Sequence, residues 1–221
     1  RCRHRRHRSQ GSEDHADRNE VHLMVYLLDS PRFASATPPS DSFNRADSST
    51  VIGVTDVGGL AYTQGGGVSR TWGIDGNKAY LAAANGSGNH DYSLDLDITI
   101  SDNYTVTTAI SGNQSNIQPA IYARGTYIVR CARSSGSDYL WCYRGGTYLG
   151  GNELYLPGDS YGVKVAGTTI NFLKNGTSFL QVTGQTTAQT NTHVGIWVTG
   201  TSWSGSNPTT VRFDYLNITT P

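Results

Sequence analysis

The sequence is short of the features that mark several protein classes. Only three cysteines occur in 221 residues, Cys2, Cys131 and Cys142, which are too few for a disulfide scaffold. The longest apolar run, residues 21–28, is far shorter than the roughly 20 residues that a membrane-spanning helix needs. We therefore expect neither a disulfide-stapled fold nor a membrane partner.

Charge is also scarce. Charged residues make up 15% of the chain and the formal net charge is zero. This zero conceals a division, because residues 1–40 hold seven Arg against five acids, whereas residues 41–221 hold ten Lys or Arg against twelve acids. Since the second part has no basic excess, we expect no nucleic-acid partner for it.

No stretch keeps helical periodicity over two turns, whereas alternation of apolar and polar residues is common. In residues 92–100 the apolar side chains fall on one strand face and the polar ones on the other. The 26 glycines and 13 tyrosines fit a chain of short strands and many turns. The composition thus predicts an all-β domain with one face of each strand in the core.

The first 35 residues differ from the rest. Residues 1–20 have almost no apolar side chains, and arginines alternate there with His4 and His7, so we expect a disordered basic and polar tail. A nucleic-acid arm and a metal-binding histidine cluster are the alternatives. Met24 is the only methionine, which leaves open whether residues 1–23 are translated. Residues 36–40 form a Pro-rich linker to a domain over residues 41–221.

Turn residues predict two hairpins. Residues 75–77 join strands within 72–84, and Asn175-Gly176 joins 169–174 to 177–182. In the second hairpin, a two-residue loop places Phe172 opposite Phe179.

The first and last predicted strands, 41–49 and 211–219, should lie side by side, because the lone apolar Phe43 needs a partner to bury it. A β-bulge near Asp214 and Tyr215 would keep the apolar residues of the last strand inward. The opening strand followed by Thr71-Trp-Gly-Ile-Asp-Gly-Asn-Lys-Ala-Tyr-Leu81 resembles concanavalin A-like (LamG-type) jelly-roll domains, over roughly residues 41–219. The resemblance implies a two-sheet antiparallel jelly-roll sandwich of roughly a dozen strands.

Such folds include glycosidases, which need two carboxylates flanking the scissile bond. After Glu20 the only glutamate is Glu153, and the family's Glu-x-Asp-x-x-Glu strand motif is absent. Asp95 and Asp97 share a strand face, as exposed acids often do. His90 and His193 stand in no nucleophile or zinc spacing. We therefore expect no catalytic residues.

The resemblance also makes calcium the metal to consider, because LamG-like domains often bind it through loop carboxylates and backbone carbonyls. Asp91, Asp102 and Asp159 are the candidates, but none stands in an EF-hand-like spacing. We expect no metal site and no cofactor, and a structural calcium stays open.

Residues 127–144 predict a hairpin about Gly136-Ser137 that pairs Cys131 with Cys142. A cross-strand disulfide and two free core thiols are both open. One strand face carries the two cysteines, and the other carries Tyr139, Trp141 and Tyr143. Either face is a candidate for the core, since aromatic residues also dominate cores.

If the cysteines face inward, the outward side chains form a platform for sugar rings. Arg130 falls opposite Tyr143 in this pairing and can donate hydrogen bonds to a sugar, while Trp203 lies in a loop that can close one end. The candidate glycan-binding residues are therefore Arg130, Tyr139, Trp141, Tyr143 and Trp203.

Because LamG-type domains occur in many phage tail and other virion proteins, the resemblance implies a non-catalytic virion surface module. A minor tail, fibre or capsid decoration protein would serve adhesion to glycans on a host surface or display of a stable domain. It would be homo-oligomeric in an assembly with other virion proteins. The alternatives are an extracellular polysaccharide-acting enzyme or its carbohydrate-binding module, and a purely structural assembly protein.

Overall fold

The computed structural model describes residues 37–66, 70–84, 88–98, 102–112, 117–186, 189–203 and 210–221, all within the unit Ala36–Pro221. Side chains of residues 66, 84, 88–90 and 201–203 are not described. The described residues form sixteen strands and no helix. The predicted tail lies outside them, as do Cys2 and Met24, so the disorder of residues 1–35 stays a prediction.

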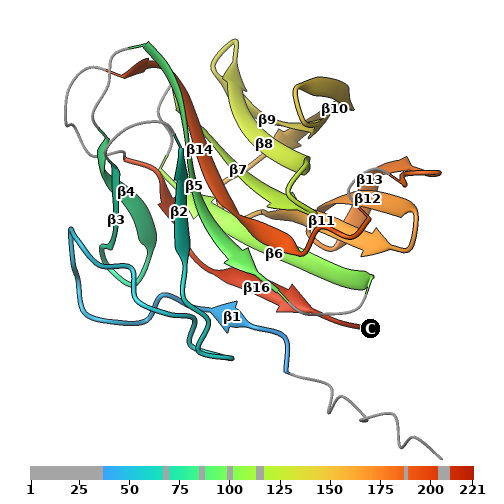
Figure 1. Ribbon diagram of the computed structural model, residues 1–221. Coiled ribbons are helices and arrows are strands. Elements are labelled where there is room, and N and C mark those ends of the chain that lie inside the picture. Colours follow the sequence, from blue (N-terminus) through green and yellow to red (C-terminus); the bar gives the residue numbers. More distant parts are fainter. Residues whose placement is uncertain are drawn as a thin grey trace, which may run out of the picture. The chain divides into compact units, whose positions relative to one another are not determined.

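Two antiparallel sheets make up the domain (Figure 1). In the larger sheet the order is β13-β12-β11-β6-β15-β4-β3, and β16 also pairs with β6 and carries β1 at its other edge. Its strands are β1 (Ser40–Asp41), β3 (Arg70–Ile74), β4 (Ala79–Ala84), β6 (Asn103–Ser111), β11 (Ser160–Ala166), β12 (Thr169–Lys174), β13 (Thr177–Val182), β15 (Arg212–Phe213) and β16 (Leu216–Thr219).

The smaller sheet has the order β10-β9-β8-β7-β14-β5-β2. Its strands are β2 (Thr63–Gly66), β5 (Gly88–Asp97), β7 (Ile117–Ala123), β8 (Tyr127–Ser134), β9 (Ser137–Arg144), β10 (Thr147–Tyr155) and β14 (His193–Trp203). The predicted all-β jelly-roll sandwich is confirmed. Among the described residues no helix is long and apolar enough to span a membrane.

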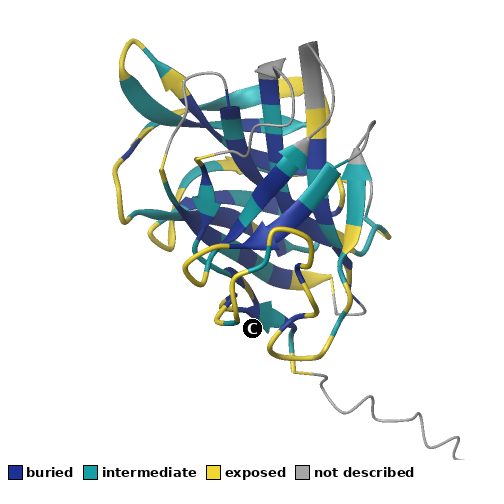
Figure 2. Ribbon diagram, turned by 90° about the vertical axis from the view of Figure 1, so that its left-hand side faces the viewer, coloured by how far each residue is buried: buried dark blue, intermediate teal, exposed yellow. Residues whose placement is uncertain are grey.

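The core lies between the two sheets and is built by alternate residues of each strand, which Figure 2 shows as buried stretches inside the domain. β5 illustrates the pattern, because Tyr92, Leu94 and Leu96 are fully buried while Asp91 and Asp97 on the other face are exposed. The predicted alternation of this strand is therefore confirmed up to Ile98, which is also buried.

The first and last strands do lie side by side, with Asp41 of β1 opposite Leu216 of β16. Asp214 and Tyr215 interrupt the last strand between β15 and β16. This interruption shifts the parity, so that both halves turn their apolar side chains inward. The four buried residues are Val211, Phe213, Leu216 and Ile218.

The second predicted hairpin turns at Asn175-Gly176, but its register differs from the expected one. Phe172 lies opposite Leu180, not Phe179, because the pairing shifts by one residue between Phe172 and Leu173. An extra residue on β13 creates a β-bulge there, which the two-residue loop alone does not predict.

The predicted first strand is much shorter than residues 41–49, because the chain leaves the extended conformation at Phe43, whose φ is 54°. The backbone N–H of Phe43 donates to Asp41 Oδ1 at 2.7 Å, which holds the turn and directs the fully buried ring into the core.

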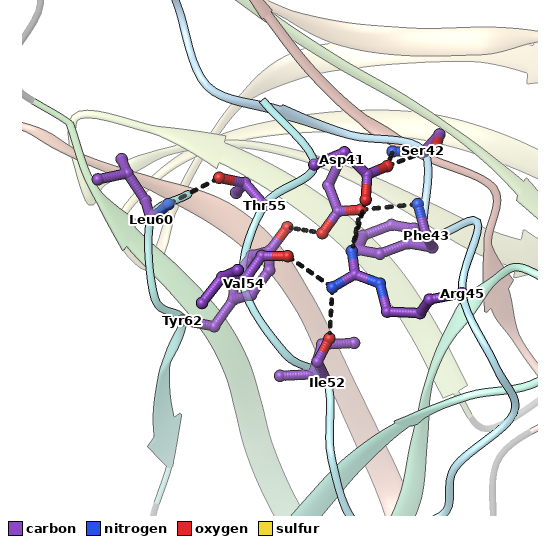
Figure 3. A network of polar contacts seen from close by, with 10 residues as sticks. Asp41, Ser42, Phe43, Arg45, Ile52, Val54, Thr55, Leu60 and Tyr62 are labelled. Carbon is purple, nitrogen blue, oxygen red and sulfur yellow. Dashed lines mark hydrogen bonds and ion pairs between the residues drawn. The ribbon is translucent and has the colours of Figure 1, made fainter. Parts of the chain in front are cut away.

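Arg45 organises the loop that follows (Figure 3). Its Nη2 donates to Asp41 Oδ1, and its Nη1 donates to the carbonyls of Ile52 at 2.8 Å and Val54 at 2.5 Å. Tyr62 OH donates to the second oxygen of Asp41 at 2.9 Å. A single guanidinium thus ties residues 45–54 to the buried end of β1.

Candidate functional site

The β8–β9 hairpin turns at Ser135-Gly136, one residue before the predicted position. Both residues have positive φ, 50° and 86°, as a type I′ turn requires. The shift changes every cross-strand pair, so Cys131 lies opposite Leu140 and Cys142 lies opposite Val129. The predicted pairing of the two cysteines is therefore wrong.

Both cysteines are nevertheless free, buried thiols in the core. Their strand face, with Val129 and Leu140, is fully buried. Burial raises the pKa of both thiols well above the ordinary value, so neither forms a reactive thiolate at neutral pH. Of the two arrangements that the sequence left open, the structure has the one with inward cysteines.

The opposite face of this hairpin carries Arg130, Tyr139, Trp141 and Tyr143, and all four side chains are partly exposed. Arg130 pairs with Trp141 across the strands, not with Tyr143 as expected from the earlier turn position. Its guanidinium still lies 4.6 Å from the centre of the Tyr143 ring. Trp203 ends β14 opposite Gly88, and its side chain lies outside the described residues.

The register of the smaller sheet continues the row of Arg130 and Trp141 onto two further strands. Trp197 of β14 lies opposite Ala120 of β7, and Ala120 lies opposite Arg130. The small side chain of Ala120 leaves room between its larger neighbours, so that the Arg130 guanidinium lies 5.4 Å from the Trp197 ring centre. Tyr143 in turn meets Tyr148 edge-on at 5.5 Å.

These residues form the outer strip, which we define as Trp197, Arg130, Tyr143 and Tyr148. It rests on an apolar cluster that is separate from the main core and consists of buried Ala120, Tyr122 and Ile128 with Tyr143 and Trp197 packed against them. The sequence reasoning missed Trp197. The alternation of this strand could have predicted its outward position, since Val194, Ile196 and Val198 occupy the inward face.

An open pocket of about 400 Å³ adjoins the outer strip. Carboxylate, amide, imidazole and indole groups meet in it, which is a mixture suited to a polyhydroxylated ligand. Its lining residues are Asp91, Ser93, Asp95, Tyr122, Gly125, Ile128, Asn191, His193 and Trp197.

Asp95 has the most constrained carboxylate in this pocket. Tyr122 OH donates to one oxygen and Ser93 Oγ donates to the other at 3.1 Å. Tyr122 reaches Asp95 across β14 because the residue between them is Gly195, where a Cβ would come within 2.7 Å of the Tyr122 hydroxyl. Burial raises the pKa of Tyr122 well above its ordinary value, so its hydroxyl stays a donor.

Asp95 and Asp97 share the outer face of β5, but of the two only Asp95 lines the pocket. Asp97 is exposed and accepts a hydrogen bond from Thr192. Glu153 lies on β10, where Lys174 Nζ contacts its carboxylate at 3.3 Å. Of the two domain histidines, His193 lines the pocket, and the side chain of His90 lies outside the described residues.

The three calcium candidates lie apart. Asp91 lines the pocket, Asp102 lines a separate cavity of about 50 Å³, and Asp159 forms an ion pair with Lys174 at 3.3 Å. Within the described residues, no group of three or more His, Cys, Asp or Glu side chains is placed to hold a metal ion.

The sequence matches no protein-family model and none of the curated proteins. Solved structures do share the fold. The chain is similar to a β-1,3-glucanase from Mycobacterium marinum, with a TM-score of 0.54, 10% identity, and coverage of 81% of this chain and 97% of the glucanase.

Two further structures show the same likeness. One comes from work on endo-acting O-glycanases of the human gut microbiota, with a TM-score of 0.53, 11% identity, and coverage of 82% and 98%. The other is a glycosyl hydrolase family 16 protein from Mycobacterium smegmatis, with a TM-score of 0.50, 11% identity, and coverage of 81% and 98%. The shared fold is the concanavalin A-like jelly roll. At such low identity the likeness extends to the fold alone.

Proposed function

We propose that the outer face of the smaller sheet binds glycans without cleaving them. The main support for this proposal is that the outer strip, Trp197, Arg130, Tyr143 and Tyr148, lies beside a pocket lined by carboxylate and amide groups. Sugar rings present flat C–H faces that pack on aromatic rings, while their hydroxyls need polar partners nearby. The names of the similar structures, a glucanase and O-glycanases, support a glycan as the ligand.

We include the residues proposed from sequence in this site. Tyr139, Trp141, Tyr143 and Arg130 lie on the same sheet face as the pocket, two or three strands from Trp197. Trp203 remains a proposed contact, because only its backbone position in β14 is described.

A glycan array followed by titration tests the proposal. Trp197→Ala and Tyr143→Ala should each lower the affinity of any glycan found by at least about ten-fold, since each removes a stacking ring. Tyr80→Ala is the matched control, because Tyr80 is also partly exposed and carries an arginine over its ring, at 4.2 Å, but lies in the other sheet. Equal losses in all three variants, or no glycan bound by the native protein, would contradict the proposal.

The absence of hydrolysis is a second expectation. Asp91 and Asp95, the carboxylates that line the pocket from β5, are four residues apart, or about 13 Å along a strand. This backbone spacing is longer than either separation between the two carboxyl groups of glycosidases, about 5 Å and about 6.5 to 9.5 Å. Prolonged incubation with β-1,3-glucan and mucin glycans should release no reducing ends. Turnover that is lost in Asp95→Asn would instead favour the alternative, a polysaccharide-acting enzyme.

We further propose a biological role for this glycan binding. The chain would be a virion surface module (a minor tail, fibre or decoration protein) that presents this face to host glycans as a homo-oligomer. Its support is the resemblance of the sequence to LamG-type domains of virion proteins. Capsid and tape-measure genes beside the coding gene, and the chain in purified particles, are expected. Neighbouring polysaccharide-degrading genes would favour the enzyme alternative and an extracellular location.

A further inference from the structure

We infer that the glycan carries carboxylated sugars and that Arg130 receives the carboxylate. This inference rests on the proposed function of the same face and names the class of ligand: an anionic polysaccharide, such as one containing uronic acid or sialic acid, whose charged sugars are separated by neutral ones.

The first observation is that Arg130 is a partly buried cation without an ion-pair partner. Its Nη1 donates to Gln118 Oε1 at 3.2 Å, and its Nε is buried without a partner. In the part of the chain that the structure describes, no carboxylate lies within ion-pair distance of it. Charges withdrawn from water are normally paired, so an unpaired guanidinium beside a ligand pocket indicates an anionic ligand.

Arg212 in the other sheet shows the usual arrangement. Its guanidinium lies 4.2 Å from the ring centre of Tyr80, much as Arg130 lies over Tyr143, but its Nη2 also contacts Asp75 Oδ2 at 2.7 Å. The two sites thus share the stacked ring and differ in the carboxylate. In the Arg130 site, we assign the missing carboxylate to the ligand.

The surroundings of Arg130 leave donors for such a group. The rings of Tyr143 and Trp197 attract the guanidinium but do not replace an acceptor in its plane. The second N–H of Nη1 and those of Nη2 take no acceptor among the described residues. Because Gln118 accepts from Arg130 through Oε1, its amide nitrogen is left to donate, and arginine and amide together suit the two oxygens of a carboxylate.

The rest of the site limits how densely the ligand is charged. Asp91 and Asp95 lie on β5, beside β14, and the charge of Asp91 opposes the lowering of the Arg130 pKa that burial causes. A second carboxylate at that end would be repelled by both acids. The pocket therefore suits a neutral sugar, whose hydroxyls donate to the aspartates.

Matched pairs of oligosaccharides test this inference on the full chain. The probes are hyaluronan oligosaccharides, oligogalacturonate and sialyllactose, each with its carboxyl-reduced form. We expect at least one carboxylated probe to bind about ten-fold more tightly than its reduced form, and the alternating hyaluronan to be preferred over the uniformly charged galacturonate. Arg130→Met should abolish this preference. Arg212→Met, which removes the same charge from the other sheet, should retain it.

Arg130→Lys provides a second measurement if Arg130→Met does not fold. It keeps the charge but loses the planar fork, so the preference should fall by about five-fold or more while the unfolding temperature is kept. Equal binding of every carboxylated probe and its reduced form would overturn the inference and leave glycan binding intact, as would an unchanged preference in both Arg130 variants. Failure to bind any glycan would instead contradict the proposed function itself.

Discussion

Replacing Arg45 with methionine should lower the free energy of unfolding by about 3 to 5 kcal/mol, because it removes one partner of a buried ion pair. Asp41 is only 1% exposed, so without the guanidinium its carboxylate stays in the core with the hydrogen bonds from Phe43 and Tyr62 but without a positive charge beside it. The carbonyls of Ile52 and Val54 lose their donor in the same step. Methionine keeps the apolar stem and therefore isolates the loss of the charged group.

The loss should depend on pH. Burial already raises the pKa of Asp41, although hydrogen bonds from Arg45, Phe43 and Tyr62 oppose the shift. Removing Arg45 raises the folded-state pKa further, so the folded variant takes up a proton at a higher pH than the unfolded chain does. Its stability therefore increases as pH falls through the raised pKa, and its deficit against the native protein should narrow between about pH 7 and pH 5.

Urea unfolding at both pH values measures this effect. Arg133→Met is the matched control, because Arg133 pairs with Asp138 at 3.2 Å on the surface, where an ion pair contributes at most about 1 kcal/mol. A deficit no larger than that of Arg133→Met, or one that stays constant with pH, would show that Arg45 does not compensate the buried carboxylate.

The same region shows why parts of the fold were not readable from sequence. Alternation correctly identified the inward face of β5 and the parity change at Asp214 and Tyr215, because burial on one sheet face dictates both patterns. The short β1 was missed because Phe43 adopts a positive φ, which a bulky residue rarely does. The positive φ of Phe43 is held by a hydrogen bond from its own N–H to Asp41, and the pattern of apolar residues gives no sign of such a bond.

The candidate site also has one part that was predictable from sequence and one part that was not. The partly exposed positions of Tyr139, Trp141 and Tyr143 follow from the parity of one hairpin, and an error of one residue in its turn changed their partners but not their face. The meeting of Trp197 with Arg130 was beyond the sequence. It requires β14 to lie between β7 and β5, and this strand order depends on contacts between segments more than 70 residues apart.

Gly195 lies on β14 between Asp95 of β5 and Tyr122 of β7, so the same residue serves the strand order and the site. Replacing it with alanine should lower the free energy of unfolding by about 3 kcal/mol, which is in the upper part of the range for overpacking. A Cβ at this position would overlap the Leu94 carbonyl oxygen, which belongs to the backbone of β5 and cannot turn aside. The same Cβ would lie 2.7 Å from the Tyr122 hydroxyl.

Because Tyr122 reaches Asp95 only across Gly195, the alanine should also break their hydrogen bond and lower glycan affinity at a temperature where the variant is still folded. Gly146→Ala is the matched control, since a Cβ there meets nothing within 4 Å. Denaturant unfolding and glycan titration of both variants separate the two effects. If Gly195→Ala were as stable as Gly146→Ala, β14 would have to lie farther from β5, and Tyr122 could not be held against Asp95.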